Sequence, residues 1–278
     1  MSKQRTVSIL VVLYNKEISD SSTINNLVSS NEDLSRTKLI IWNNGPNKVI
    51  DTTSSLENKF NEVFLVETLE NLPLSGIYNA FMKNYISDYY MFLDDDSSVT
   101  DSYLSVINDQ SDAGLFVPVL VMNGNVVSPK PDNKGGLDYI PEKIDGLVAM
   151  GSGLILSREL SDCIIKKYGD CFDNRFYFYG VDTSLFYRIK RLHLENEVSI
   201  VQGFEHSVST FKKENTKVKK FRQLEASYSL GLKLRYYPSI KIFATFFRMS
   251  FLRFFRLSNR VTFFYVLKAY ASGKHYRM

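Results

Sequence analysis

The chain of 278 residues has little cysteine: Cys163 and Cys171 are its two, and they form no Cys-x-x-Cys pair. This count argues against a disulfide scaffold or a zinc site and fits a reducing compartment. No uninterrupted apolar run is long enough to cross a bilayer. Residues 6–14 are apolar, but they are β-branched and lead into Asn-Lys-Glu without a cleavage site, so we expect a buried strand and not a signal peptide.

Two phosphate-binding motifs are also missing. A dinucleotide-binding fold carries Gly-x-Gly-x-x-Gly after its first strand, whereas this chain reads Leu-Tyr-Asn-Lys-Glu-Ile-Ser there. It has no Walker A motif either. A bound phosphate must therefore be held in another way, which points to a metal ion.

Acidic residues are scarce at the C-terminal end. The whole chain has 34 Lys and Arg and 30 Asp and Glu; from Lys212 onward there are 16 and 2, which leaves 18 and 28 before it. Such a split indicates an acidic body joined to a basic surface that suits a membrane or a nucleic acid.

What the first third does contain is an alternation of strand and helix patterns. The spacing predicts buried strands at residues 6–14, 37–45, 62–68 and 89–96, with helices at residues 21–31 and 74–86 between them. Further on, residues 114–130 read as a strand, an Asn-Gly turn and a returning strand, and residues 180–194 as a helix. This order predicts an α/β fold with a mostly parallel sheet, whose ligands bind beyond the carboxyl ends of the strands.

Three consecutive carboxylates, Asp94, Asp95 and Asp96, follow the fourth predicted strand directly. Asp96, Ser97 or Ser98 could cap a helix that begins near Val99, but a cap explains one carboxylate and not three. Mg²⁺ and Mn²⁺ prefer oxygen ligands and are often held by one or two carboxylates together with a diphosphate. We therefore favour a divalent metal ion at this point of the chain.

These features together resemble the family 2 glycosyltransferases of the GT-A fold, in particular bacterial rhamnosyltransferases of surface-polysaccharide assembly. The resemblance spans residues 7–206 and depends on the order and spacing of short motifs. In chain order they read VVLYNK, IIWNNGPN, ENLPLSGIYNAFMKN, FLDDD, MGSGLILSREL, FYFYGVDTSLFYRIKR and GFEHSVST. The resemblance implies a GT-A, Rossmann-like catalytic domain at residues 1–211, with helices flanking the sheet.

The resemblance also implies a site for a nucleoside diphosphate sugar. The residues at matching places are Tyr14, Asn15, Asn43, Asn44, Asn71, Ser75, Gly76, Asn79, Asp94 and Asp95. Asn43 stands where the family normally has a base-reading Asp, and an Asn side chain donates as well as accepts hydrogen bonds. Asp94 and Asp96 match the outer members of the Asp-x-Asp signature; Asp96 is the implied ligand of Mg²⁺ or Mn²⁺, and His206 matches a late histidine that completes the metal shell.

On the acceptor side, the resemblance implies contacts from Ser152, Gly153 and Tyr179. Asp182 matches the catalytic base, and we expect it at the start of a helix, after a Tyr-rich strand; the alternative is a simple helix cap. One base and one displacement would invert the anomeric carbon. Arg188, on the same helix, is expected to face solvent.

The C-terminal segment, residues 212–278, reads as basic, aromatic helices interrupted at Pro238. On a helical wheel Lys241, Arg248, Arg253 and Arg256 fall within an arc of roughly 140°. The other side of the same helix carries Phe243, Phe247, Phe251 and Phe254. This pattern is typical of an amphipathic helix that lies in a membrane interface.

The sequence and the resemblance together predict an inverting, metal-dependent hexosyltransferase, cytoplasmic and peripheral on the inner membrane. Its donor would be dTDP-rhamnose or a UDP-sugar, and its acceptor a growing glycan on a polyprenyl diphosphate. A galactofuranosyltransferase is an alternative, because transferases of that sugar also carry an Asp-Asp-Asp stretch. A non-catalytic membrane protein or a nucleic-acid-binding protein is a further alternative, although basic helices loaded with Phe do not favour nucleic acid.

Overall fold

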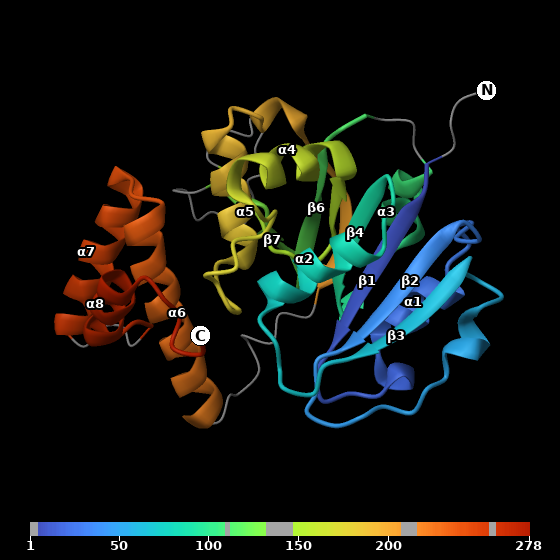
Figure 1. The fold of residues 1–278 in the computed structure, drawn as a ribbon, viewed down its shortest axis with the longest axis horizontal. Helices are drawn as coiled ribbons and strands as arrows, with labels where there is room; N and C mark the ends of the chain where they lie inside the picture. Colours follow the sequence, from blue (N-terminus) through green and yellow to red (C-terminus); the bar gives the residue numbers. More distant parts are fainter. Residues whose placement is uncertain (1–4, 109–111, 132–146, 207–215, 256–259) are drawn as a thin grey trace. The chain divides into compact units, whose positions relative to one another are not determined.

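The computed structural model describes residues 5–108, 112–131, 147–206, 216–255 and 260–278 (Figure 1). The chain forms two compact units. The first contains Met1–Leu72, Ile77–Cys171 and Arg188–Ser207, and the second contains Pro73–Gly76, Phe172–Tyr187 and Val208–Met278. The expected domain boundary after residue 211 falls outside the described residues and stays a prediction.

A mixed sheet forms the centre of the first unit. Within the described residues it has nine strands in the order β3-β2-β1-β4-β10-β6-β11-β5, and β7 pairs with β6. The strands are β1 (Val7–Leu13), β2 (Thr37–Asn43), β3 (Glu62–Glu67), β4 (Tyr89–Asp94), β5 (Ser97–Ser98), β6 (Leu115–Met122), β7 (Asn125–Ser128), β10 (Leu154–Ser157) and β11 (Val198–His206). A separate two-stranded sheet pairs β8 (Lys130–Pro131) with β9 (Leu147–Val148).

Strand direction follows from the connections. β3, β2, β1 and β4 lie side by side and are parallel, because each is reached by a crossover (Figure 1). β10 runs antiparallel to both β4 and β6, and β6 is parallel to β11. The Asn123-Gly124 turn joins β6 and β7 as an antiparallel hairpin. The predicted α/β fold with a mostly parallel sheet is therefore confirmed.

The central strands are apolar on both faces because both faces are buried. Ile9, Leu10 and Val11 are completely inaccessible, as are Leu39 and Ile40 in the neighbouring strand. Helices pack against this sheet, and α2 does so through aromatic rings: Phe81 stacks edge-on against Phe92 of β4 at a centroid distance of 5.6 Å. Burying one such side chain stabilises the fold by about 1.5–3 kcal/mol.

The helices of the first unit lie between its strands in sequence. They are α1 (Ser22–Ser29), α2 (Leu74–Asn84), α3 (Asp101–Leu104) and α4 (Arg158–Tyr168), with short 3-10 turns at Ile18–Asp20, Thr53–Leu56, Ser105–Ile107 and Glu195–Glu197. Serine side chains fix two of the helix starts: Ser21 accepts from the Ile24 N–H and Ser157 from the Leu160 N–H. The first three residues of α2 belong to the second unit.

The second unit is helical. It contains the first seven residues of α5 (Val181–Arg191), then α6 (Thr216–Tyr236), α7 (Ile240–Phe254) and α8 (Phe263–Ser272). α6 ends at Tyr236, before Pro238, and Ser239 caps α7 by accepting from the Ile242 N–H. Gly231 brings α6 close to α8, since a Cβ at this position would lie 2.3 Å from the Val266 carbonyl oxygen. Among the described residues, no helix combines the length and hydropathy that a membrane span needs.

Candidate functional site

The parallel strands of the first unit bring their carboxyl ends to one edge of the sheet. Leu13 of β1 is in register with Asn43 of β2, Asn43 with Glu67 of β3, and Val12 of β1 with Asp94 of β4. The polar residues that follow these strands therefore share one edge, where ligands of parallel sheets bind.

The middle carboxylate of the acidic stretch already has a cation. Lys16, in the turn after β1, places its Nζ 2.6 Å from Asp95 Oδ1, and the Asp95 side chain is only 16% exposed. This ion pair neutralises one of the three adjacent carboxylates. Asp94 and Asp96, on either side of it, are half-buried.

The backbone of the acidic stretch is held by three hydroxyl groups from two other segments. Thr23 Oγ1 accepts from the Ser97 N–H at 2.8 Å, and Ser21 Oγ donates to the Asp95 carbonyl at 3.0 Å. From the far side, Ser152 Oγ accepts from the Asp94 N–H at 3.1 Å and lies 2.9 Å from Ser97 Oγ. These contacts hold the backbone from which the three carboxylates project.

The helix-cap interpretation of Asp96, Ser97 and Ser98 is wrong. Ser97 and Ser98 form the short strand β5, and α3 begins only at Asp101. Its cap is Thr100, whose hydroxyl accepts from the Tyr103 N–H. The three carboxylates therefore do not serve a helix N-terminus.

Ser152 and Gly153 are predicted on the acceptor side, and Ser152 contacts the acidic stretch directly. Ser152 is 2% exposed and makes the two hydrogen bonds given above. Gly153 has a φ of +85°, and a Cβ there would lie 2.6 Å from the Pro118 ring, so only glycine fits. Their contact with an acceptor stays a prediction, and the observed contacts give them a supporting role.

Asn43 and Asn44, predicted to bind the nucleotide, hold the segments that follow β2 and β3. Asn43 donates to the Asn47 carbonyl at 2.7 Å and to Glu67 Oε1 at 3.0 Å, and its own oxygen accepts from the Gly45 N–H. Asn44 donates to the Leu72 carbonyl and accepts from the Leu72 N–H, which shapes the turn at Asn71. Both asparagines are buried.

Glu67 is a carboxylate at this edge that the sequence interpretation missed. Its exposed side chain accepts from the Val49 N–H and from Asn43, and these two hydrogen bonds hold the pKa of Glu67 below its ordinary value. The signal was present in the sequence, because Glu67 lies near the end of the third predicted strand, as Asn43 lies near the end of the second. The side chain is thus ionised and oriented by Asn43.

Tyr14 and Asn15 follow β1 at the same edge. Tyr14 is 52% exposed, and the Asn15 N–H donates to the Gly45 carbonyl at 2.7 Å. Asn15 has a φ of +52° and Asn71 a φ of +53°, a conformation that Asn tolerates better than most residues. Asn79 lies on α2 and is half-buried. The nucleotide contacts of these residues stay predictions.

His206 is the last residue of β11, and its backbone pairs with Ser97, the residue after Asp96. This register puts residue 206 beside the acidic stretch, while its side chain is outside what the structure describes. Among the described residues no group of three His, Cys, Asp or Glu side chains forms a ready metal cage. The carboxylates Asp94 and Asp96 nevertheless supply the oxygen ligands that Mg²⁺ and Mn²⁺ accept when a diphosphate completes the shell.

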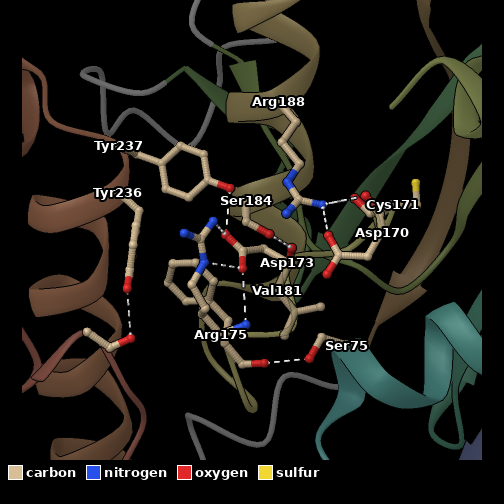
Figure 2. A network of polar contacts seen from close by, with 12 residues as sticks. Ser75, Asp170, Cys171, Asp173, Arg175, Val181, Ser184, Arg188, Tyr236 and Tyr237 are labelled. Atoms are coloured by element: carbon tan, nitrogen blue, oxygen red, sulfur yellow. Dashed lines mark hydrogen bonds and ion pairs between the residues drawn. The ribbon is translucent and has the colours of Figure 1, made fainter. Parts of the chain in front are cut away.

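In the second unit, residues 172–180 form an irregular segment and not the expected Tyr-rich strand. Ser75 donates to the Phe176 carbonyl at 2.6 Å (Figure 2). The Leu74 N–H donates to the Tyr177 carbonyl at 2.8 Å. Phe176 and Tyr177 are both buried, so the side chains do not alternate between two faces. Gly76, in the same turn, has room for a methyl group.

A buried carboxylate connects this segment to the residue that follows α6. Asp173 accepts two side-chain hydrogen bonds from Arg175, at 2.7 and 2.6 Å, and one from the Tyr237 hydroxyl at 2.7 Å (Figure 2). The guanidinium of Arg175 lies 3.7 Å from the centre of the Tyr236 ring. Burial alone would raise the pKa of Asp173, but the hydrogen bonds from Arg175 and Tyr237 outweigh it and hold the pKa below its ordinary value.

Asp182, the predicted base, lies in the first turn of α5. Its Oδ1 accepts from the N–H of Thr183 at 2.7 Å. Burial raises the pKa of Asp182, although the Thr183 N–H and the charge of Lys233 act in the opposite direction. Tyr179 is half-buried and stacks on Phe178 at a centroid distance of 5.2 Å. A carboxylate with a raised pKa is a better proton acceptor than an ordinary Asp.

The expectation that Arg188 faces solvent is wrong. Its side chain is 2% exposed and donates to the Asp170 carboxylate at 2.6 Å and to the Asp170 and Cys171 carbonyls (Figure 2). The guanidinium also lies over the Tyr168 ring. Arg188 therefore holds the end of α4 and the residues after it in the first unit, because four partners surround one buried charge.

The sequence matches no protein-family model and no curated protein, but the fold matches solved structures. It superimposes on S. aureus TarS with a TM-score of 0.53 at 14% identity, covering 83% of this chain and 40% of that chain. S. aureus TarS 1-349 in complex with UDP gives a TM-score of 0.54 at 14% identity, covering 83% and 66%.

A third match is the mannosyltransferase PcManGT from Pyrobaculum calidifontis in complex with GDP-Man and Mn²⁺. Its TM-score is 0.51 at 12% identity, covering 89% of this chain and 65% of that chain. At these identities the comparisons establish a shared fold. This chain spans 40% of the length of the first TarS structure.

Proposed function

We propose that this protein is a glycosyltransferase that moves a sugar from a nucleoside diphosphate sugar to a hydroxyl group. The observation that carries the proposal is the acidic stretch at the carboxyl end of β4, with Asp95 neutralised by Lys16 and its backbone fixed by buried hydroxyls. Solved structures with this fold hold UDP, UDP-GlcNAc, or GDP-Man with Mn²⁺. The likeness supports a nucleotide-sugar donor for this chain as well.

The donor diphosphate would lie at the acidic stretch. Asp96, with Asp94 beside it and His206 from β11, would hold Mg²⁺ or Mn²⁺, which supplies positive charge to the diphosphate that leaves. Lys16 remains paired with Asp95, so the pair keeps the middle carboxylate from repelling the phosphates. Ser152 and Thr23 keep the stretch rigid during the reaction.

The nucleobase would lie near the ends of β1, β2 and β3, where Tyr14 is exposed. We assign the contact with an N–H group of the nucleobase to Glu67. The side-chain amide of Asn43 already donates to Glu67 and to the Asn47 carbonyl. An ionised carboxylate is a strong acceptor for the imide N–H of uracil or thymine. Asn43 thus orients the acceptor group, and donors of the UDP or dTDP class fit it.

Asp182 is proposed as the base that removes the proton from the acceptor hydroxyl, with Tyr179 as a stacking surface for a sugar. Its raised pKa supports proton transfer at neutral pH. A single displacement assisted by one base inverts the anomeric carbon. The rhamnosyltransferase-like motifs favour dTDP-rhamnose or a UDP-sugar as donor.

The acceptor is proposed to be a growing glycan on a polyprenyl diphosphate, presented at the cytoplasmic face of the inner membrane. The basic, aromatic helices of the second unit support this location, because a lipid-linked acceptor is reached only at a membrane surface. The protein would be peripheral and would bind no nucleic acid.

The proposal is tested by titrating UDP and dTDP into the protein in a calorimeter, with and without Mn²⁺, and by following hydrolysis of UDP-sugars and dTDP-rhamnose. We expect binding that needs the metal and is lost in Asp96→Ala. Asp33→Ala, on the loop before β2 at the other edge of the sheet, is the matched control and should bind as the wild type does. Absence of nucleotide binding in the wild type with Mn²⁺ would rule the function out.

A further inference from the structure

α7 exposes most of its phenylalanine side chains to solvent. Ile242 is the one buried residue among its fifteen. Phe247 is 66% exposed and Phe254 82% exposed, and Phe243 and Phe251 lie on the same face. A helix that packed only to stabilise this unit would bury these side chains, and an exposed apolar patch of this kind is typical of an interaction surface.

α8 continues the same surface. Val266 and Ala269 are buried, and Gly231 of α6 lies against them, while Phe263, Phe264 and Leu267 are exposed. Phe246 and Phe263 stack at 5.5 Å and join the two helices. Between them lies a hollow of about 760 Å³ lined by Phe247, Arg248, Ser250, Phe251, Arg253, Phe254 and Phe263. We call the exposed apolar residues of α7 and α8 the aromatic face.

Basic residues border the aromatic face. Arg248 and Arg253 lie in the wall of the hollow, and Lys241 and Lys268 are exposed on the same two helices. The chain contains ten Lys and Arg after Glu225 and no Asp or Glu. The surface thus combines exposed phenyl rings with a single sign of charge, which complements an anionic, apolar partner.

We propose that the aromatic face docks on an anionic lipid bilayer, with the phenyl rings entering the boundary between headgroups and acyl chains and the basic residues contacting the headgroups. A bilayer satisfies both halves of the surface at once. A second copy of the chain would place Arg248 and Arg253 against the same residues of its partner, and these charges would repel. A nucleic acid would neutralise the basic residues but leave the rings in water.

This inference rests on the proposed function only for the reason why the protein would bind a bilayer, namely to reach a lipid-linked acceptor. Docking itself needs neither donor nor acceptor. It is therefore measured on the full chain without nucleotide sugar, so that a failure of docking and a failure of glycosyl transfer are observed separately.

The experiment is sedimentation with vesicles of phosphatidylcholine alone or with 30% phosphatidylglycerol, the latter fraction chosen as roughly that of an anionic leaflet. The wild type should bind the anionic vesicles. Phe247→Ala/Phe251→Ala should bind them about a hundredfold more weakly, because burial of each phenyl ring contributes roughly a factor of ten. Arg248→Gln/Lys268→Gln should lose about fivefold per charge, and added salt should produce a similar loss.

Ile50→Ala/Ile86→Ala is the matched control, since it removes two exposed apolar side chains from the first unit and should bind as the wild type does. A second measurement uses the fluorescence of Phe247→Trp. Brominated lipid should quench the fluorescence of this variant more than that of the wild type, whose single tryptophan is Trp42. All substituted side chains are exposed, so thermal unfolding should not change.

Three outcomes overturn the proposal. The first is equal vesicle binding by the wild type and Phe247→Ala/Phe251→Ala. The second is a lipid-free dimer that this variant converts to a monomer, which would assign the face to a second copy. The third is duplex DNA binding that Arg248→Gln/Lys268→Gln abolishes while vesicle binding is absent.

Discussion

The first unit and helices α7 and α8 of the second unit use aromatic residues in opposite ways. In the first unit, Phe81, Phe92 and Tyr90 are buried and pack edge to face between α2 and the sheet. In the second unit, Phe247 and Phe254 stand mostly in solvent. An aromatic content of 14% therefore does not describe one large core.

The surroundings of the charged residues also differ between the two regions. Charged side chains at the sheet edge of the first unit are paired or hydrogen-bonded, as Lys16 with Asp95 and Glu67 with Asn43 show. The basic residues of α7 and α8 have no carboxylate on their own helices. The comparison suggests that the first unit is preorganised for a small charged ligand and that the end of the second is built to meet a surface.

The largest effect should be on the rate of transfer, in a variant that lacks the proposed base but still binds the donor. Asp182→Asn removes the proposed base from the second unit and should lower transfer about 10²–10⁴-fold. Binding of UDP or dTDP by the first unit should not change, because the substitution leaves the acidic stretch intact. Turnover and calorimetric titration of the same preparation test both statements, and an equal loss of donor binding would contradict the assignment.

The raised pKa of Asp182 predicts how the rate of transfer depends on pH. Burial raises this pKa, and a base acts only when it is deprotonated. The rate should therefore fall as the pH decreases through a value above the ordinary pKa of about 3.9 for Asp. A rate profile that stays flat down to pH 4 would remove Asp182 from the reaction.

The next largest effect concerns stability of the second unit. Asp173→Ala leaves Arg175 and the Tyr237 hydroxyl without their buried acceptor, and should lower the free energy of unfolding by about 3 kcal/mol. Asp162→Ala is the control: its carboxylate meets Arg158 at 3.7 Å on an exposed helix face, and its loss should cost less than about 1 kcal/mol. Urea unfolding followed by circular dichroism measures both.

The lowered pKa of Asp173 predicts that part of the free energy of unfolding is lost in acid. Its folded-state pKa lies below the ordinary value, so it stabilises the fold above the unfolded-state pKa of about 3.9. This contribution should be lost as the pH falls below about 4 and through the lower folded-state pKa. Asp173→Asn should lack the component, and a variant with the wild-type pH dependence would contradict this account.

The smallest effect should come from the nucleobase contact in the first unit. Glu67→Gln replaces a charged acceptor and should weaken UDP binding about tenfold. CDP, whose base has no imide N–H, should bind the wild type more weakly than UDP, and the variant should narrow this difference. Glu62→Gln, at the other end of β3, is the control. Unchanged UDP affinity in Glu67→Gln would exclude this contact while leaving the function intact.

Most of the first unit could be predicted from the sequence because its strands are long apolar runs. The predicted strand at residues 6–14 is Val7–Leu13, and the predicted turn at Asn123-Gly124 joins β6 to β7. The segment before Asp182 could not be predicted, because its alternating Phe and Tyr suggested a strand. Hydrogen bonds from Leu74 and Ser75, about a hundred residues earlier, decide its shape instead.

The candidate site was predictable in position but not in detail. The order of the strands places Asp94–Asp96 at the ligand edge, and the sequence shows this order. The pairing of Asp95 with Lys16, the orientation of Glu67 by Asn43 and the burial of Arg188 depend on contacts between residues 17 to 79 positions apart. Periodicity contains no information about such contacts.

The reversed direction of β10 has a consequence for how the protein can vary. Because β10 runs opposite to β4, the chain enters β10 at the acidic edge and leaves it, at Ser157, on the opposite edge. Residues inserted before Gly153 would crowd the carboxylates, whereas residues inserted after Ser157 would lengthen a connection remote from them. Changes in length ahead of this strand should therefore alter what binds at the acidic stretch, whereas changes in length behind it should leave that binding unchanged.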